Sequence, residues 1–238
     1  MGVVETISLS MGLGWAAGIN LYAAIFMLGV LGSSGNLALP PDLLILQDPM
    51  VIAAAGFMYV IEFVVDKIPG VDTGWDVLHT FIRIPAGAVL AAGAVGDLAP
   101  GAELAAAIAG GTLAAGAHAT KAGTRALINT SPEPFTNWTA SIAEDVAVFG
   151  GLWAALYNPW LFLVLLVLFI GLSIWLVPKI WRGLKRVAAF LRRKLGGAAP
   201  PDPAAAAQAA AVPGAANVAD GVAAPDANAA RPPSGESP

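Results

Sequence analysis

Six long apolar stretches constrain this chain more than any other feature of its sequence. Each is close to the length that an α-helix, rising 1.5 Å per residue, needs to cross roughly 30 Å of hydrocarbon. The stretches run over about Ile7–Gly32, Pro49–Val65, Val77–Val95, Glu103–Thr120, Ser141–Tyr157 and Trp160–Val177. We therefore expect an all-α, polytopic membrane helix bundle with about six transmembrane helices.

The composition agrees with this fold class. Hydrophobic residues make up 57% of the 238 residues and charged residues only 12%, against roughly 25% charged residues in an ordinary globular domain. So few charges could not cover the surface of a soluble protein of this length. The absence of cysteine excludes disulfides and thiol nucleophiles. The twelve Lys and Arg residues are too few and too localised for a nucleic-acid-binding face.

The sequence divides into three parts. Residues 1–177 make up the expected transmembrane bundle, and residues 178–195 a basic amphipathic juxtamembrane helix. Residues 196–238 are rich in Ala and Pro and lack aromatic residues, which predicts a disordered tail. The basic helix is expected to bind membrane lipids, in particular the anionic inner leaflet. Its cationic residues are Lys179, Arg182, Lys185, Arg186, Arg192, Arg193 and Lys194.

The basic residues also predict an orientation in the membrane. The C-terminal basic run should be cytoplasmic. Counting back through six spans places the segments around Lys67 and around Lys121 on the same side. The loops expected on the other side, 33–47, 98–102 and 157–159, contain neither Lys nor Arg. Both termini are therefore predicted to be cytoplasmic.

Four helix starts carry local capping motifs. Asp48-Pro49 and Asn158-Pro159 each combine an Asx N-cap with Pro at the first helical position. Thr73-x-x-Asp76 and Ser141-x-x-Glu144 have the spacing of a capping box, in which the acid binds the N–H of the cap residue. These motifs predict that helices begin at the four positions.

Ionisable side chains collect near the cytoplasmic ends of the second to fifth spans, where burial is costly and function is the usual reason. Glu62 and Asp66 share one helix face, and Glu62 falls at the depth of Arg83, which predicts an ion pair between them. Asn20 and Tyr22 lie near mid-membrane in the first span. The candidate substrate or ion pathway consists of Asn20, Tyr22, Glu62, Asp66, Asp76, His79, Arg83, His118, Lys121, Glu144 and Asp145.

Three classes of function fit this set. A structural or accessory protein would use the acids as helix caps and ion-pair partners. A transporter or channel for a small solute or ion would use the carboxylates and His residues to bind a cation or relay protons. A membrane-embedded enzyme would hold a divalent metal there and act on lipid or phosphate headgroups, but no catalytic signature is present. The sequence favours transport, implies no cofactor, and names neither the solute nor the oligomeric state.

The motif Gly18-x-Asn20-x-Tyr22 and the longer run Asp66-Lys67-x-Pro69-x-x-Asp72-x-x-Trp75-Asp76-x-x-His79-x-x-x-Arg83-x-Pro85-x-Gly87-Ala88 add a resemblance. Together they resemble a bacterial integral membrane family catalogued as a domain of unknown function, of the 4126 type. The resemblance covers roughly Glu5 to Val177. It implies a multi-helix bundle in the bacterial inner (plasma) membrane and carries no activity or functional residues with it.

Overall fold

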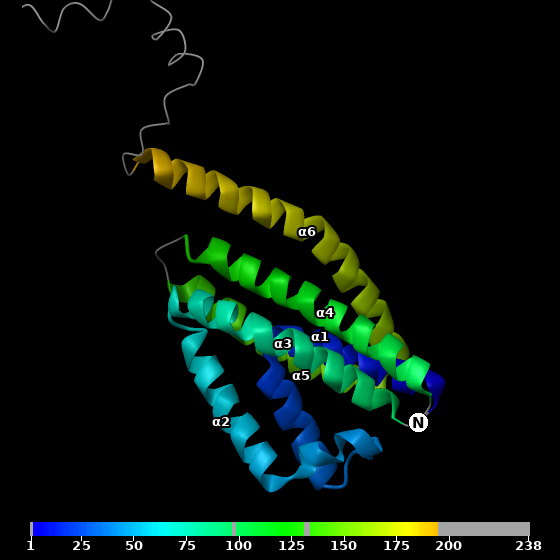
Figure 1. Cartoon of the computed structure of the whole chain (residues 1–238). Helices are drawn as coiled ribbons and strands as arrows, with labels where there is room; N and C mark the ends of the chain where they lie inside the picture. Colours follow the sequence, from blue (N-terminus) through cyan, green and yellow to red (C-terminus); the bar gives the residue numbers. More distant parts are fainter. Residues whose placement is uncertain (1, 97–98, 131–133, 195–238) are drawn as a thin grey trace, which may run out of the picture. The chain divides into compact units, whose positions relative to one another are not determined.

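The computed structural model describes residues 2–96, 99–130 and 134–194, and every regular element in that part is helical (Figure 1). The predicted tail, 196–238, lies outside the described residues. The elements are α1 (Val3–Ser33), the 3-10 helix η1 (Pro41–Gln47), α2 (Pro49–Val65), α3 (Val71–Val95), α4 (Pro100–Ile128), α5 (Pro134–Tyr157) and α6 (Pro159–Lys194). The all-α prediction is therefore confirmed.

Four of these helices, α1, α3, α5 and α6, are long and apolar enough to cross a membrane. The pair η1 and α2, bent by 69°, adds a fifth candidate span within the described residues. Helix α4 covers the fourth apolar stretch of the sequence but does not qualify. It is composed mainly of Ala and Gly, and carries His118 and Lys121 near its end. The structure thus supports a membrane helix bundle with four to five candidate spans, where the sequence predicted about six.

Two of the predicted helix starts are correct. Helix α2 begins at Pro49, and the Asp48 carboxylate accepts a hydrogen bond from the Met50 N–H at 2.7 Å. Helix α6 begins at Pro159, directly after Asn158. At both positions Pro occupies the first helical residue, where its missing N–H costs nothing.

Both predicted capping boxes are wrong. Helix α3 begins at Val71 and α5 at Pro134, so Thr73 and Ser141 lie inside helices. The acids of the two motifs, Asp76 and Glu144, instead bind arginine side chains. A buried cation offers a carboxylate a stronger hydrogen bond than a backbone N–H does, so the motif spacing alone was misleading.

Helix α1 occupies the centre of the bundle and contacts α2, α3, α4 and α5. Its apolar side chains, among them Leu9, Leu13 and Leu28, are fully buried. Trp15 of α1 packs edge-on against Phe162 and Phe169 of α6. Because α1 is surrounded on several sides, it contributes ten of the 22 residues in the buried hydrophobic cluster of the described chain.

The outer surface of the bundle is apolar, and the charges lie inside. Large hydrophobic side chains remain exposed along the helices, for example Phe81 (79%) and Ile174 (71%), whereas Glu62 and Arg83 are fully buried. A soluble protein has the reverse arrangement, since its exposed apolar patches are small. The distribution is the one expected where hydrocarbon, and not water, surrounds the helices.

Helix α6 continues past Pro178 to Lys194. The chain divides into two compact units, Met1–Ala188 and Ala189–Pro238, and all contacts described below lie within the first. Within that unit, Ile180 packs against Gly123 of α4, and Leu127 lies beside Gly183. The Nζ atom of Lys179 lies 3.1 Å from the centre of the Trp175 ring. Part of the apolar face of the basic segment is therefore covered by α4.

A buried charge network as the candidate functional site

Helix α1 is interrupted at Asn20, whose backbone is extended (φ −145°, ψ 93°). The Asn20 Oδ1 accepts a hydrogen bond from the Ala23 N–H at 3.0 Å, so Asn20 caps the second half of the helix. In an uninterrupted helix that N–H would bind the Ile19 carbonyl. The Ile19 carbonyl instead accepts a hydrogen bond from Lys121 Nζ at 3.1 Å. The interruption thus makes a main-chain oxygen available to a charged residue of α4.

The other two residues of the motif Gly18-x-Asn20-x-Tyr22 contact neighbouring helices. A Cβ atom on Gly18 would overlap the backbone oxygen of Ala114, so only glycine lets α1 approach α4 this closely. The Tyr22 hydroxyl lies 3.1 Å from His79 Nε2 on α3. Gly18 and Tyr22 therefore connect α1 to two neighbouring helices, Gly18 to α4 by close packing and Tyr22 to α3 by a hydrogen bond.

Arg83 of α3 lies at the centre of the network. Its Nη2 donates to Glu62 Oε1 of α2, and its Nη1 donates to Asp76 Oδ1 at 3.0 Å. The predicted ion pair between Glu62 and Arg83 is therefore present, and both side chains are inaccessible to solvent. Asp76 and Arg83 lie seven residues apart on one face of α3, which places both next to α2 and α4.

Lys121 of α4 joins α1, α2 and α5. Its Nζ atom lies 3.0 Å from Glu62 Oε1, 3.0 Å from Asp66 Oδ2 and 3.5 Å from Glu144 Oε2. With the Ile19 carbonyl, it has three acceptors within 3.1 Å, as many as the protons of an ammonium group. Glu62 and Asp66 do share a helix face, as their spacing predicts, because both reach this one amine.

Arg125, one turn beyond Lys121, completes the set of buried cations. Its Nε and Nη2 bind the two oxygens of Glu144 at 3.0 and 2.7 Å, a bidentate arrangement. Its Nη1 donates to the Asp66 carbonyl at 2.8 Å. We had not included Arg125 among the candidate residues. Its position four residues after Lys121 on the same helix face was the signal that could have identified it.

Both histidines are engaged by fixed partners. His118 Nδ1 lies 3.1 Å from Arg83 Nη1, and a guanidinium can only donate, so this nitrogen accepts and carries no proton. His118 Nε2 then donates to Thr80 Oγ1 at 2.7 Å. His79 Nδ1 donates to the Trp75 carbonyl at 2.9 Å, and its ring stacks on the Trp75 ring. His118 is therefore neutral in this arrangement and does not balance the carboxylates.

Two carboxylates beside the ion-paired residues, Asp72 and Asp145, form no ion pair with a described residue. Asp72, which the candidate set also lacked, accepts hydrogen bonds from the Gly70 N–H, the Thr73 N–H and Asn129 Nδ2. It lies four residues before Asp76 on the same face of α3, so helical periodicity could have revealed it. Asp145 of α5 accepts fewer hydrogen bonds than Asp72 from the described residues. It accepts a hydrogen bond from Asn20 Nδ2 at 3.1 Å.

Lys67, in the turn between α2 and α3, is the remaining cation near Asp145. Its Nζ donates to the Phe63 carbonyl at 2.9 Å and to Ser141 Oγ at 3.3 Å, and it forms no ion pair with a described residue. Burial lowers the pKa of Lys67, and the negative charges of Asp145 and Asp66 oppose that shift. Lys67 thus influences Asp145 through space without neutralising it by contact.

Charge in the network is unbalanced. Six carboxylates lie around four cations, the ion-paired Arg83, Lys121 and Arg125 and the neighbouring Lys67, which leaves a formal excess of two negative charges. Five of the carboxylates also have one buried oxygen without a hydrogen-bond partner in the described part of the chain. They are Glu62, Asp66, Asp72, Asp76 and Asp145. Uncompensated charge at such depth is costly.

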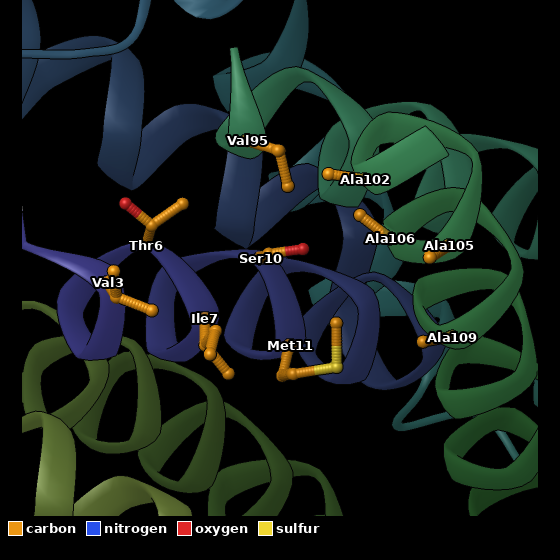
Figure 2. A pocket seen from close by; sticks show the side chains of 10 residues that line it. All are labelled: Val3, Thr6, Ile7, Ser10, Met11, Val95, Ala102, Ala105, Ala106 and Ala109. Atoms are coloured by element: carbon orange, nitrogen blue, oxygen red, sulfur yellow. The ribbon is translucent and has the colours of Figure 1, made fainter. Parts of the chain in front are cut away.

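Two of the cavities in the described part of the chain lie toward opposite ends of α4. One, of about 330 Å³, has Lys121 and Glu144 in its wall together with Trp15 and Phe169. The other, of about 400 Å³, lies near the start of α1 and is almost entirely apolar, with Ser10 and Thr6 as its polar residues (Figure 2). A search of the described residues for three or more His, Asp or Glu side chains placed to hold a metal ion found none.

The structure therefore brings all eleven candidate residues into one connected region, built by α1 to α5. Asn20 and Tyr22 attach α1 to it, and His79 and His118 lie at its edge along α3 and α4. No match was found among curated proteins or among solved structures. A family model described as "Domain of unknown function (DUF4126)" matches residues 7–179. The chain accordingly belongs to the DUF4126 family, whose domain is one of unknown function.

Proposed function

We propose that this protein moves protons, or a small solute or ion coupled to them, across a membrane through the buried charge network. The observation that carries the proposal is the excess of carboxylates over cations in a region closed to solvent. A network built only to hold helices together would be expected to balance its charges, since each uncompensated buried charge destabilises the fold. A network that exchanges protons or cations requires groups whose charge can change.

The interruption of α1 supports the same function. Broken helices inside membrane bundles place main-chain groups and half-helix ends next to ions and substrates. Here the first half of α1 ends with the Ile19 carbonyl on Lys121, where the negative end of a helix favours a cation. The second half begins at Asn20, beside the carboxylate of Asp145. Both ends thus meet the network at the same place.

Asp145 is the residue that we assign to proton exchange. The other carboxylates are held by cations, or in the case of Asp72 by three hydrogen-bond donors. Asp145 forms no ion pair with a described residue, accepts a hydrogen bond from the neutral Asn20 side chain, and keeps one buried oxygen without a partner among the described residues. A carboxylate without a cationic partner gains a proton at less cost than one held in an ion pair.

The test is proton movement in proteoliposomes that enclose a pH-sensitive dye. We expect Asp145→Asn to abolish the flux, because the amide cannot ionise but retains the shape of the side chain. The matched control is Glu103→Gln. Glu103 is an exposed acid in the first turn of α4, at the end of that helix far from Lys121. Equal flux in wild type and Asp145→Asn, or no flux above empty liposomes over a broad ion panel, would favour the structural role.

We further propose that the bundle lies in the bacterial inner membrane with the basic segment of α6 on the cytoplasmic side. The start of α1 lies beside Val95 and Ala102, at the opposite end of α4 from that segment, so the prediction that both termini are cytoplasmic does not fit this arrangement. Six helices cover the six apolar stretches, and the exposed bases of α6 fit the positive-inside rule and an anionic leaflet. Lys121 and Arg125 contribute less to this argument than their positions suggested, because both are buried in ion pairs. Reporter fusions after Gly101 and Gly196 test it, and periplasmic activity at Gly196 would contradict the orientation.

A further inference from the structure

The cavity beside Lys121 has the chemistry of a binding site. Its volume of about 330 Å³ is within the range of small-molecule pockets. Most of its wall is apolar, from Ala117, Ala143 and Ala147, with the hydroxyls of Thr120 and Thr124 nearby. Two aromatic residues, Trp15 and Phe169, line it with their rings 5.9 Å apart. It is the described cavity that reaches the charge network.

Glu144 connects this cavity to the network. It is 17% exposed, the largest exposed fraction among the ion-paired side chains, whose other members are at most 5% exposed. A molecule in the cavity can therefore contact the negatively charged network through the Glu144 carboxylate. Aromatic rings and a carboxylate in the wall of one cavity favour organic cations, since a ring face and a carboxylate both attract positive charge.

An anion would find few partners in the same cavity. The three protons of Lys121 are directed to Ile19, Glu62 and Asp66. Arg125 donates to Glu144 and to the Asp66 carbonyl. Of the lining residues, Trp15 Nε1 remains a buried donor without a partner. A single indole N–H does not offset the repulsion of two excess carboxylates.

We infer that the cavity binds an organic cation with an apolar body, such as a lipophilic amine or quaternary ion. This inference rests on the proposed transport function and names the class of substrate that would enter by this route. The cationic centre lies between Glu144 and the Trp15 and Phe169 rings, and the apolar body lies against the Ala side chains of α4 and α5. Binding relieves part of the negative charge that protons otherwise balance.

The probe is tetraphenylphosphonium, with tetraphenylborate as an ion of the same shape and opposite charge. Equilibrium dialysis of the full-length protein in detergent, corrected for empty micelles, measures saturable binding of each. We expect the cation to bind and the anion not to compete with it. Glu144→Gln should raise the Kd by about tenfold or more, the loss of a favourable charge interaction. Glutamine keeps one oxygen that can accept a hydrogen bond from Arg125, so this substitution should disturb the fold little.

A second variant tests the place of binding without changing a charge. Ala147→Trp fills the cavity from an exposed position on α5 and should abolish binding. Ala105→Trp, which fills the apolar cavity toward the other end of α4, is the matched control and should leave the Kd unchanged (Figure 2). Binding of the cation that survives Ala147→Trp would overturn the inference, as would saturable competition by tetraphenylborate.

The two proposals fail in different ways. If the cation does not bind while proton flux still requires Asp145, the substrate class is wrong and the transport function stands. If the cation binds with the expected dependence on Glu144 and Ala147 while no flux is found, the binding site stands and transport is wrong. Equal binding of both ions would indicate an apolar groove that does not distinguish the sign of the charge and is occupied by lipid chains. This result would overturn the cation site.

Discussion

The surface where α1, α3 and α4 meet has two halves that hold the helices by opposite means. Before Asn20, glycine and alanine bring the backbones together, and Gly14 of α1 lies directly against Gly110 of α4. After Asn20, the same helices present buried charges, including Asp76 and Arg83 on α3 and Lys121 on α4. One half is held by shape, and the other by electrostatics.

The difference concerns what each half can do. In the small-residue half, a single added methyl group meets another helix, as a Cβ on Gly110 would overlap the Cβ of Ala91. Such packing fixes the distance between helices and leaves no room for change. In the charged half, several carboxylate oxygens have no partner in the described residues. Proton or cation binding can therefore alter the charge of this half while the other half keeps the frame in place.

The largest effect should come from removing a cation from the charged half. Lys121→Met leaves Glu62 and Asp66 short of a partner and raises the excess of negative charge. We expect a loss of about 3–5 kcal/mol in the free energy of unfolding, the range for breaking a buried ion pair. Titration with a denaturing detergent in mixed micelles measures it.

Removing an acid instead of a base distinguishes a network with excess negative charge from a balanced one. Glu62→Gln removes one negative charge from a set that already has too many, and Asp76 and Asp66 still hold Arg83 and Lys121. Its cost should be smaller than that of Lys121→Met, and the double variant should cost less than the sum of the two. Strict additivity, or a larger loss for Glu62→Gln, would argue that the network has no excess negative charge.

Sequence reasoning found the charged half because charge inside an apolar stretch is conspicuous. The pair of Glu62 and Arg83 followed from helix periodicity and depth alone. The capping boxes failed because local spacing does not show which helix lies opposite, and Arg125 took the carboxylate of Glu144. The six predicted stretches each correspond to a helix, yet α4 is too rich in Ala and Gly to count as a span by its own apolarity.

The small-residue half was harder to recognise, because glycines also occur where nothing approaches them. On α4, a Cβ on Gly110 would overlap Ala91 of α3, while a Cβ on Gly116 would meet nothing within 4 Å in the described residues, and the sequence around the two does not separate them. The interruption at Asn20 was equally hidden, since asparagine in an apolar helix also serves as an interhelical hydrogen-bond partner. Both features depend on tertiary contacts that no local pattern encodes.

A smaller effect is expected in the small-residue half. Gly110→Ala should destabilise the protein by about 1–3 kcal/mol, the usual cost of overpacking, because α3 and α4 must move apart. Gly116→Ala, six residues away on an exposed face of the same helix, is the matched control and should be neutral or slightly stabilising. The same unfolding titration compares them. Equal stability of the two variants would show that close packing does not fix this half.

The smallest effect should occur at the junction of the two halves, at Tyr22. The Tyr22 hydroxyl binds His79 Nε2 across α1 and α3, and the ring stays packed when the hydroxyl is removed. Tyr22→Phe should therefore cost about 1 kcal/mol, the net contribution of one hydrogen bond. Tyr157→Phe, at an exposed tyrosine at the end of α5, should have no effect on the unfolding titration. A loss as large as that of Lys121→Met would mean that Tyr22 belongs to the charge network and not to its boundary.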